Sequence, residues 1–420
     1  MYRSFLAGSA TLALTATSAL ADERANVLSN YADIALAGYS DSLVTALALQ
    51  DAVTALVATP SVETLDAARN AWIAARVPYQ QTEVFRFGNP IVDDWEGKVN
   101  AWPLDEGLMD YVDASYGGPT DENEFAALNV IANPTFSIAG MDVDATDITP
   151  ELIGDVLNEA DGIETNVARG YHAIEFLLWG QDLNGTDAGA GDRPYTDFVE
   201  GDGCTGGNCD RRVDYLTAAT DLLITDLEFI IDQWDENGAA RTDLLADPDA
   251  GIVAMITGMG SLSYGEQAGQ RMRLGLMLND PEEEHDCFSD NTHNSHYYDG
   301  KGVQNVYLGQ YERIDGTVIE GPGLTALVAA VDPALDDEVR GKLDTTMVAL
   351  TAIVAAAENG MAYDQMLDRR NAEGEALIMA GVDGLIDQTR SFERIVGALS
   401  LHDVAFEGSD SLDDPNAVFQ

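Results

Sequence analysis

A histidine and a glutamate three residues apart, His172 and Glu175, form the sharpest chemical pair in the sequence. They belong to the segment Gly-Tyr-His-Ala-Ile-Glu, residues 170–175, whose apolar neighbours recur at helical spacing. Residues three apart share one face of a helix, so an imidazole and a carboxylate can reach one ion. Metal-binding helical bundles use Glu-x-x-His pairs with the same geometry. The pair predicts a metal site, although a helix-surface ion pair would look the same in the sequence.

Another glutamate, Glu83, lies where an apolar helical stripe would continue. The stripe consists of Leu65, Ala68, Trp72 and Tyr79, and Arg76 shares its face. A buried carboxylate and a buried guanidinium need each other or a ligand, because an unpaired buried charge is very costly. A helix end that emerges from the core into solvent is the alternative.

A similar pattern recurs in residues 252–273, which are apolar at first and then polar from Ser263 through Glu266 to Arg273. Both patterned helices lead into an irregular block. We therefore interpret the two halves of the chain as a degenerate internal repeat.

The block of residues 285–299 contains three of the five histidines. His293 and His296 could chelate a metal or contribute to a shared site, with Asp299 as a further carboxylate. The alternative is a polar loop whose Asn and Asp side chains bond their own backbone.

Two other segments carry candidate ligands. Residues 182–187 are acidic and hint at a calcium loop, but the Gly and Glu are misplaced for an EF-hand, so we expect a turn-rich linker. Cys204 and Cys209 flank Thr-Gly-Gly-Asn, which favours a loop-closing disulfide over a metal site in an oxidising compartment. Cys287 is then left over, as a small buried hydrophobe or as part of a site.

Helical periodicity dominates the elements that must position these residues. Long helices are expected near residues 25–58, 61–87, 163–180, 209–234 and 249–278, with two or three more closing the chain. Alternating Val- and Ile-rich runs are lacking, so strands should be few. The Gly- and Asp-rich stretch 184–208 is the best domain boundary. We predict an all-α fold of two helical-bundle domains, residues 22–195 and 196–420, with long irregular inserts.

The charge balance narrows the choice of ligand. Of 420 residues, 21 are Lys or Arg and 73 are Asp or Glu, which gives a net charge of −52. Such a field repels phosphate backbones and anionic headgroups, so nucleic-acid binding is not expected. A strongly negative charge favours the binding of a metal ion, and it is equally typical of a protein adapted to salt.

The first 21 residues have the composition of a signal peptide. Arg3 precedes a short apolar run, and Ala19-Leu20-Ala21 is an A-x-A cleavage site. The run is short for a membrane span, and no later run reaches the required length. We expect an exported protein of the periplasm or cell envelope without a membrane span.

Five segments, in order and spacing, resemble the imelysin family, and most closely its iron-regulated proteins of the bacterial envelope. These are residues 76–88 (Arg-Val-Pro-Tyr-Gln-Gln-Thr-Glu-Val-Phe-Arg-Phe-Gly), residues 101–106 (Ala-Trp-Pro-Leu-Asp-Glu), the G-x-H-x-x-E signature at 170–175, residues 258–266, and residues 285–299. The resemblance runs from about residue 31 to residue 402.

The resemblance implies two all-α bundles with a metal site near their junction. In metal-binding relatives, a Glu on the helix before the signature and an Asp in the following loop join the His and Glu. Carried over, Glu83 matches that Glu, and Asp93 or Asp94 is the loop Asp, of which we take Asp94. The predicted ligands are thus His172, Glu175, Glu83 and Asp94, holding a divalent ion, with iron expected and zinc the alternative.

Two functions fit this resemblance. The first is a metal-binding or accessory factor that works with an iron-uptake component of the envelope. The second is a metal-dependent peptidase, with Glu106 or Glu266 as the base. Arg76 is a further candidate site residue under either function. No H-E-x-x-H segment is present. We therefore favour binding over catalysis.

Overall fold

The structure is a computed structural model that describes residues 9–121 and 123–419, with side chains from residue 22 onward. The predicted signal peptide, residues 1–21, lies outside the residues with described side chains. The chain is 64% helical with 4% strand, which confirms the all-α prediction.

The helices and strands follow one another with long irregular segments between α3 and α4 and between α8 and α9. In chain order they are α1 (Ser9–Ala58), α2 (Val62–Gln80), α3 (Pro90–Glu96), β1 (Thr135–Ile138), β2 (Met141–Asp144), α4 (Gly170–Trp179), α5 (Cys209–Trp234), α6 (Ala239–Ala246), α7 (Pro248–Ser261), α8 (Leu274–Leu278), α9 (Thr292–Leu308), β3 (Gln310–Glu312), β4 (Val318–Glu320), α10 (Leu324–Val331), α11 (Pro333–Glu358), α12 (Tyr363–Leu367), α13 (Ala372–Ala398) and α14 (Asp410–Asp413). The strands form two antiparallel hairpins, β1–β2 and β3–β4.

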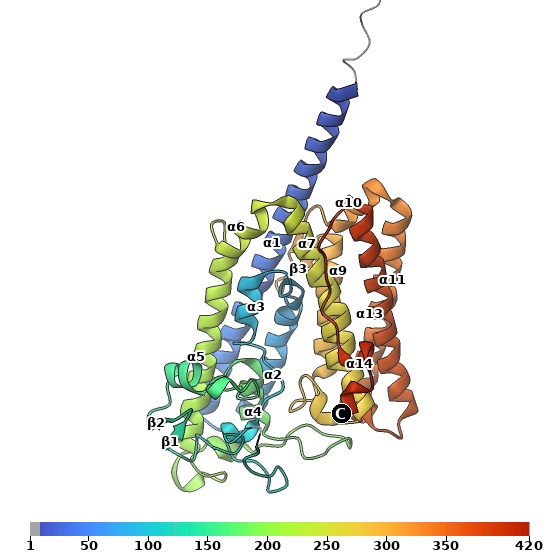
Figure 1. The fold of residues 1–420 in the computed structure, drawn as a ribbon. Coiled ribbons are helices and arrows are strands. Elements are labelled where there is room, and N and C mark those ends of the chain that lie inside the picture. The colour runs from blue at the N-terminus through green and yellow to red at the C-terminus, as the bar shows by residue number, and fades with distance from the viewer. Residues whose placement is uncertain (1–8, 122, 420) are drawn as a thin grey trace, which may run out of the picture.

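The helices gather into two groups that lie side by side (Figure 1). The first group contains α1, α2, α4 and α5, and the second contains α7 with its continuation, α9, α11 and α13. Contacts of α2 with α9 and of α1 with α7 join the groups. Helix α5 follows the predicted domain boundary at residue 195 and packs against α1, and that boundary stays a prediction.

Helix α1 is a core helix of the first group. Between Asp22 and Ala58 it contains an 18-residue stretch apolar enough to cross a bilayer, with a mean hydropathy of 1.3, and 33% of that stretch is buried. Core helices pass the same test, and here Val27, Tyr31 and Leu49 are buried where α1 packs against α2 and α5.

Two expected helices differ from the observed elements. The helix expected from residue 163 begins at Gly170, because Arg169 is extended and Gly170 has a φ of 82°. The helix expected over 249–278 is continuous, but Leu262–Arg273 is a π-helix, a wider turn that often marks a functional segment.

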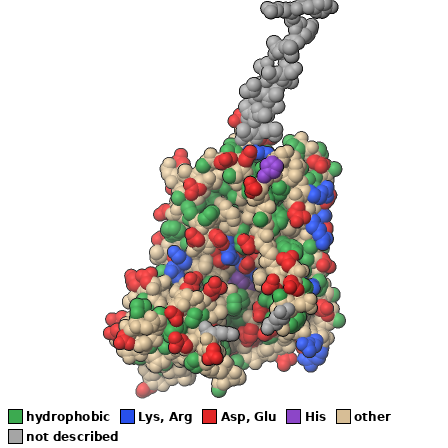
Figure 2. All heavy atoms as spheres, viewed as in Figure 1, with side chains coloured by type: hydrophobic (Ala, Val, Ile, Leu, Met, Phe, Trp, Pro, Cys, Tyr) green, Lys and Arg blue, Asp and Glu red, His purple; other side chains and the backbone are tan. Residues whose placement is uncertain are grey.

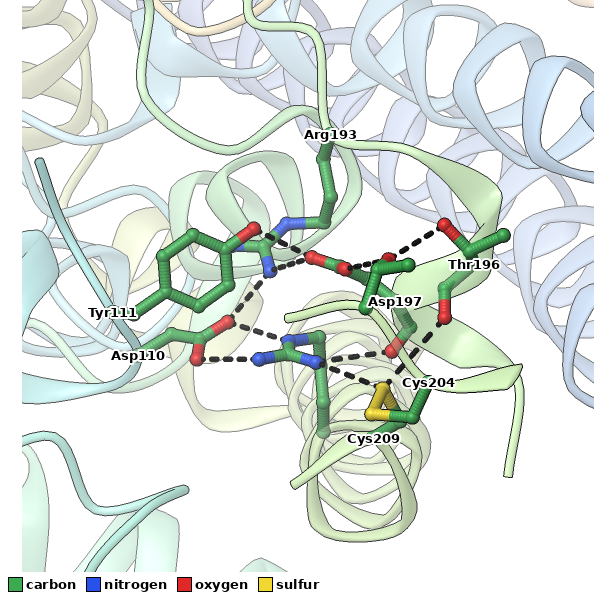
Figure 3. The surroundings of a disulfide bond; sticks show 9 residues. Asp110, Tyr111, Arg193, Thr196, Asp197, Cys204 and Cys209 are labelled. Carbon is green, nitrogen blue, oxygen red and sulfur yellow. Dashed lines mark hydrogen bonds and ion pairs between the residues drawn. A yellow bond between two sulfur atoms is a disulfide. The ribbon is translucent and has the colours of Figure 1, made fainter. Parts of the chain in front are cut away.

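Cys204 and Cys209 form a disulfide with a Cα–Cα distance of 5.9 Å, and Cys287 is a buried free thiol. Beside the bridge, Asp110 accepts two hydrogen bonds from Arg212 and one from Arg193 (Figure 3). Tyr111 donates to Asp197 in the same cluster. The bridge therefore closes its loop onto a buried network that anchors the start of α5.

Acidic side chains are spread over the face shown in Figure 2, and Lys and Arg are sparse among them. This distribution matches the net charge of −52.

Candidate metal centre

The signature helix α4 is buried along its whole length, and its start is fixed by a glycine. The N–H of Tyr171 donates to the carbonyl of Val99 at 2.7 Å. A Cβ at Gly170 would lie 2.5 Å from that carbonyl oxygen, and the positive φ is strained for any other residue. Gly170 therefore lets the helix begin directly against the loop that carries Trp102.

His172 is fully buried and held on one side by Glu175. Its Nδ1 lies 3.1 Å from Oε2 of Glu175, and its ring packs against Trp102 with centroids 5.1 Å apart. Oε1 of Glu175 accepts hydrogen bonds from the backbone N–H and the hydroxyl of Ser289, at 3.0 and 2.6 Å. An Nδ1–H donated to Glu175 leaves the Nε2 lone pair free, and Nε2 has no hydrogen-bond partner.

The second half of the chain supplies two groups beside His172. The ring of His285 lies 4.7 Å from that of His172, and its Nδ1 has no hydrogen-bond partner. Asp286, also buried, accepts from Arg76 at 2.9 Å, from Asn291 at 2.8 Å and from Ser295 at 2.5 Å. Both residues lie in the loop that precedes α9.

One potential ligand atom from each of His172, His285 and Asp286 lies within 4.8 Å of the others. Two imidazoles and a carboxylate are a donor set that suits iron, zinc and similar divalent ions. The two unpartnered ring nitrogens are buried polar groups that a metal ion would satisfy. The residues present therefore fit a metal ion.

The electrostatics of the cluster agree with this fit. Burial, Arg76 and Arg271 hold the pKa of His172 and His285 well below the usual value, so both rings are neutral and able to ligate. Burial and the Asp286 carboxylate raise the pKa of Glu175 well above its usual value. A bound cation would favour the charged form of Glu175.

Glu83 lies in a neighbouring cluster around Arg271, at the turn that follows α2. Arg271 bonds to Glu83 at 2.8 Å, to Glu266 at 2.8 Å and to Asp299 at 3.2 Å. The contacts with Glu83 and Asp299 join the π-helical segment to the turn after α2 and to α9, whereas Glu266 belongs to the same segment as Arg271. Glu83 is therefore placed with an arginine, and the group of ligand atoms within 4.8 Å does not include it. Its role as a metal ligand stays a prediction.

A cavity of about 680 Å³ opens between the helix groups and connects the two clusters. Its lining includes His285, Trp102 and Asn100, together with Arg271, Glu266 and Arg86. Asn100 accepts from Arg76 at 2.6 Å, so the cavity reaches the residues that hold Asp286. Arg86 lies 3.3 Å from Glu96 and 3.8 Å from Glu266.

The other candidate residues are dispersed. Asp94 is exposed on α3, and its neighbour Asp93 pairs with the partly exposed Arg86. Glu106 is buried, and this burial raises its pKa. His296 is fully buried against Tyr363 with both ring nitrogens unpartnered, and Nδ1 of His293 also lacks a partner. The described residues form no ligand group of three around these two histidines.

The reasoning from residue spacing did not select His285 and Asp286 as ligands. Their signal is weak, because they are adjacent in the chain and belong to a loop. The clustering of histidines and the family resemblance both pointed to residues 285–299, but neither selected these two residues.

A model of the imelysin family, peptidase family M75, matches residues 35–392. This chain belongs to the imelysin family. It is similar to iron-regulated protein A of the cyanobacterium Synechococcus elongatus, with 37% identity over 57 residues, which are 14% of this chain and only 16% of that relative. It also shares its fold with a protein from Parabacteroides distasonis provisionally named an iron-regulated protein A precursor. That comparison has a TM-score of 0.65 and 18% identity, and it covers 90% of this chain and 95% of the other.

Proposed function

We propose that this imelysin-family chain is a periplasmic metal-binding protein that serves iron uptake as a binding or accessory factor. The observation that carries the proposal is the buried set His172, His285 and Asp286, with ligand atoms within 4.8 Å of one another. The signal-peptide composition and the Cys204–Cys209 bridge support an oxidising compartment outside the cytoplasm. The names of the similar proteins support iron.

In this proposal each residue has a distinct task. His172, through Nε2, and His285, through Nδ1, supply nitrogen ligands, and Asp286 supplies an oxygen ligand. Glu175 fixes the tautomer and orientation of His172, a role that outer-sphere carboxylates commonly take. Arg76 holds Asp286 in place. Glu83 and Asp94 remain predicted ligands, and substitution of each residue tests that role.

A metallopeptidase would use the same ion together with a carboxyl group as base. Glu106 is the residue that favours this second function, because burial raises its pKa and it lines a second cavity that shares Trp102 with the first. Glu266 suits the task less well, since Arg271 and Arg86 lower its pKa. When bound, a divalent ion would supply Lewis-acid charge for such a reaction.

Equilibrium binding to the full mature chain tests the proposal. Chelator-treated protein is titrated with Fe²⁺ without oxygen, and separately with Zn²⁺, and the thermal midpoint is measured at saturation. We expect one ion per chain and a higher midpoint, because the ion binds the folded site. His172→Ala and His285→Ala should both lose the gain with helical content unchanged.

His402→Ala is the matched control, because His402 is exposed near the C-terminus. Equal metal affinity in wild type, His172→Ala and His285→Ala would overturn the proposed site. Hydrolysis of an unfolded protein that requires the metal and is lost in Glu106→Gln would favour the peptidase.

A further inference from the structure

A second cluster of potential ligands lies apart from the histidines and consists of three aspartates. Asp182 follows α4, Asp290 lies in the loop that also carries His285, and Asp364 lies in α12. One carboxylate oxygen from each is within 4.8 Å of the other two. These segments are far apart in the sequence, so the fold itself gathers the charges.

Oδ1 of Asp182 accepts hydrogen bonds from the backbone N–H and the side-chain amide of Asn184, at 2.9 and 2.8 Å, but Asp364 has no such partner. Its exposed fraction is 1%, and neither carboxylate oxygen accepts a hydrogen bond of ordinary geometry. The backbone N–H groups of Gln365 and Asp364 lower its pKa, but burial and the nearby aspartates outweigh them. Oδ1 of Asp290 is also without a partner. Buried carboxylates of this kind are costly unless a cation or donors compensate them.

The charges that face the cluster are negative. Glu284 is 1% exposed, and its Oε2 has no hydrogen-bond partner. Burial first, and then the charges of Asp364 and Asp290, raise its pKa well above its usual value. Burial and the neighbouring aspartates raise the pKa of Asp290 and of Asp364 to about 7. In the described part of the chain, no Lys or Arg forms an ion pair with Asp182, Asp290 or Asp364.

The spacing suits a hard cation. Ca²⁺ binds oxygen ligands at roughly 2.3–2.6 Å, so two oxygens on one ion lie at most about 5.2 Å apart. Three oxygens within 4.8 Å of one another satisfy that limit without rearrangement of the backbone. Asp182 and Asp290 are partly exposed, which leaves room for water to complete the coordination that Ca²⁺ requires.

We propose that Asp182, Asp290 and Asp364 bind a Ca²⁺ ion that ties the loop after α4 to the loop before α9 and to α12. This site is independent of the proposed iron site. Its ligands are all oxygens, and none of them belongs to the residues of the iron site. The acidic residues 182–187 thus contribute a single ligand to an assembled site and do not form a linear calcium loop.

The tie has a structural consequence for the neighbouring centre. Asp290 is four residues after Asp286, in the same loop, and Asp182 follows the helix that carries His172 and Glu175. A cation between them would hold the His285–Asp286 segment against the end of α4.

The test is calorimetric titration of the chelator-treated full chain with CaCl₂ at constant ionic strength. We expect one saturable site and a rise in thermal midpoint beyond that produced by NaCl of equal ionic strength. Asp364→Asn and Asp290→Asn should each weaken binding by roughly tenfold or more, because a charged ligand is lost. Asn tolerates the positive φ of 56° at position 290, so the second variant should fold.

Asp337→Asn is the matched control, since Asp337 is exposed on α11 and its loss removes the same charge. It should bind Ca²⁺ as wild type does, and so should His285→Ala, which separates this site from the iron site. Non-saturable binding, or equal affinity in wild type and both aspartate variants, would overturn the proposal.

Discussion

The guanidinium of Arg76 donates to Oδ1 of Asp286 at 2.9 Å, between residues 210 positions apart in the chain. Seven residues after Arg76, Glu83 accepts from Arg271 at 2.8 Å. Helix α2 therefore carries a cation, Arg76, and the turn after it carries an anion, Glu83. Both pair with residues from the second half of the chain. All four side chains are buried, so these pairs fix how the two helix groups meet.

Removal of the Arg76 charge should strengthen metal binding at Asp286. In Arg76→Gln, Asp286 keeps Asn291 and Ser295 but loses its charged partner. The apo protein should be less stable, because the buried carboxylate is uncompensated. The rise in thermal midpoint on metal addition should exceed that of wild type. An unchanged rise would show that Asp286 is not a ligand.

Glu175→Gln should weaken metal binding without removing it. The amide can still contact His172, but it no longer favours the Nδ1–H tautomer as a carboxylate does. Outer-sphere partners of this kind are worth about 10–100-fold in affinity. Competition with a chelator of known affinity measures the change. A loss as complete as that of His172→Ala would make Glu175 a direct ligand instead.

Arg271→Ala should destabilise the protein more than Glu83→Ala. The first change removes the arginine partner of Glu83 and Asp299 and leaves Glu266 with Arg86 at 3.8 Å, whereas the second leaves Arg271 with two carboxylate partners. Loss of one partner from a buried ion pair costs about 3–5 kcal/mol, and we expect Arg271→Ala to reach that range in urea unfolding. In the same Glu83→Ala protein, loss of metal affinity would support the predicted ligand role of Glu83.

Stability of the metal-free protein should depend on pH through the buried imidazoles. Folding depresses the pKa of His285 below its unfolded value near roughly 6.5, so the unfolded chain binds the extra proton as the pH falls. The free energy of unfolding of wild type should therefore drop relative to His285→Gln between about pH 7 and about pH 5. A constant difference over that range would mean that His285 is not held neutral by burial.

Salt should stabilise the protein. A net charge of −52 produces self-repulsion that added ions screen. The thermal midpoint should rise between about 0.05 M and about 1 M NaCl, with calcium removed by chelator so that screening alone acts. A flat curve would mean that the surface charges are already balanced locally.

The sequence predicted the all-α class and the segment at the centre of the candidate site. Periodicity located α2 and α5 because their apolar stripes are long and continuous. It misplaced the start of α4, since residues 163–169 are apolar enough for a helix, whereas Gly170 must turn against Val99. A positive φ that depends on a distant loop has no local signal.

The ligand set shows the same limit. His172 and Glu175 are recognisable because residues three apart in a helix lie on the same face. His285 and Asp286 reach the same place only through the packing of α9 against α2, which spacing along the chain does not encode. The apolar stripe before Glu83 did predict that Arg76 and Glu83 need partners, but these partners come from elsewhere in the fold.

The candidate centre takes its histidines from opposite sides of the turn at Asp235–Gly238 that separates α5 from α6. A chain cut in that turn would leave His172 on one fragment and His285 on the other, together with the two halves of each interlocking charge pair. Neither fragment could hold the ion alone. Recovery of metal binding after the two fragments are mixed would then show that they have reassembled. The protein could therefore be divided into two complementing fragments, with metal binding as the measure of their association.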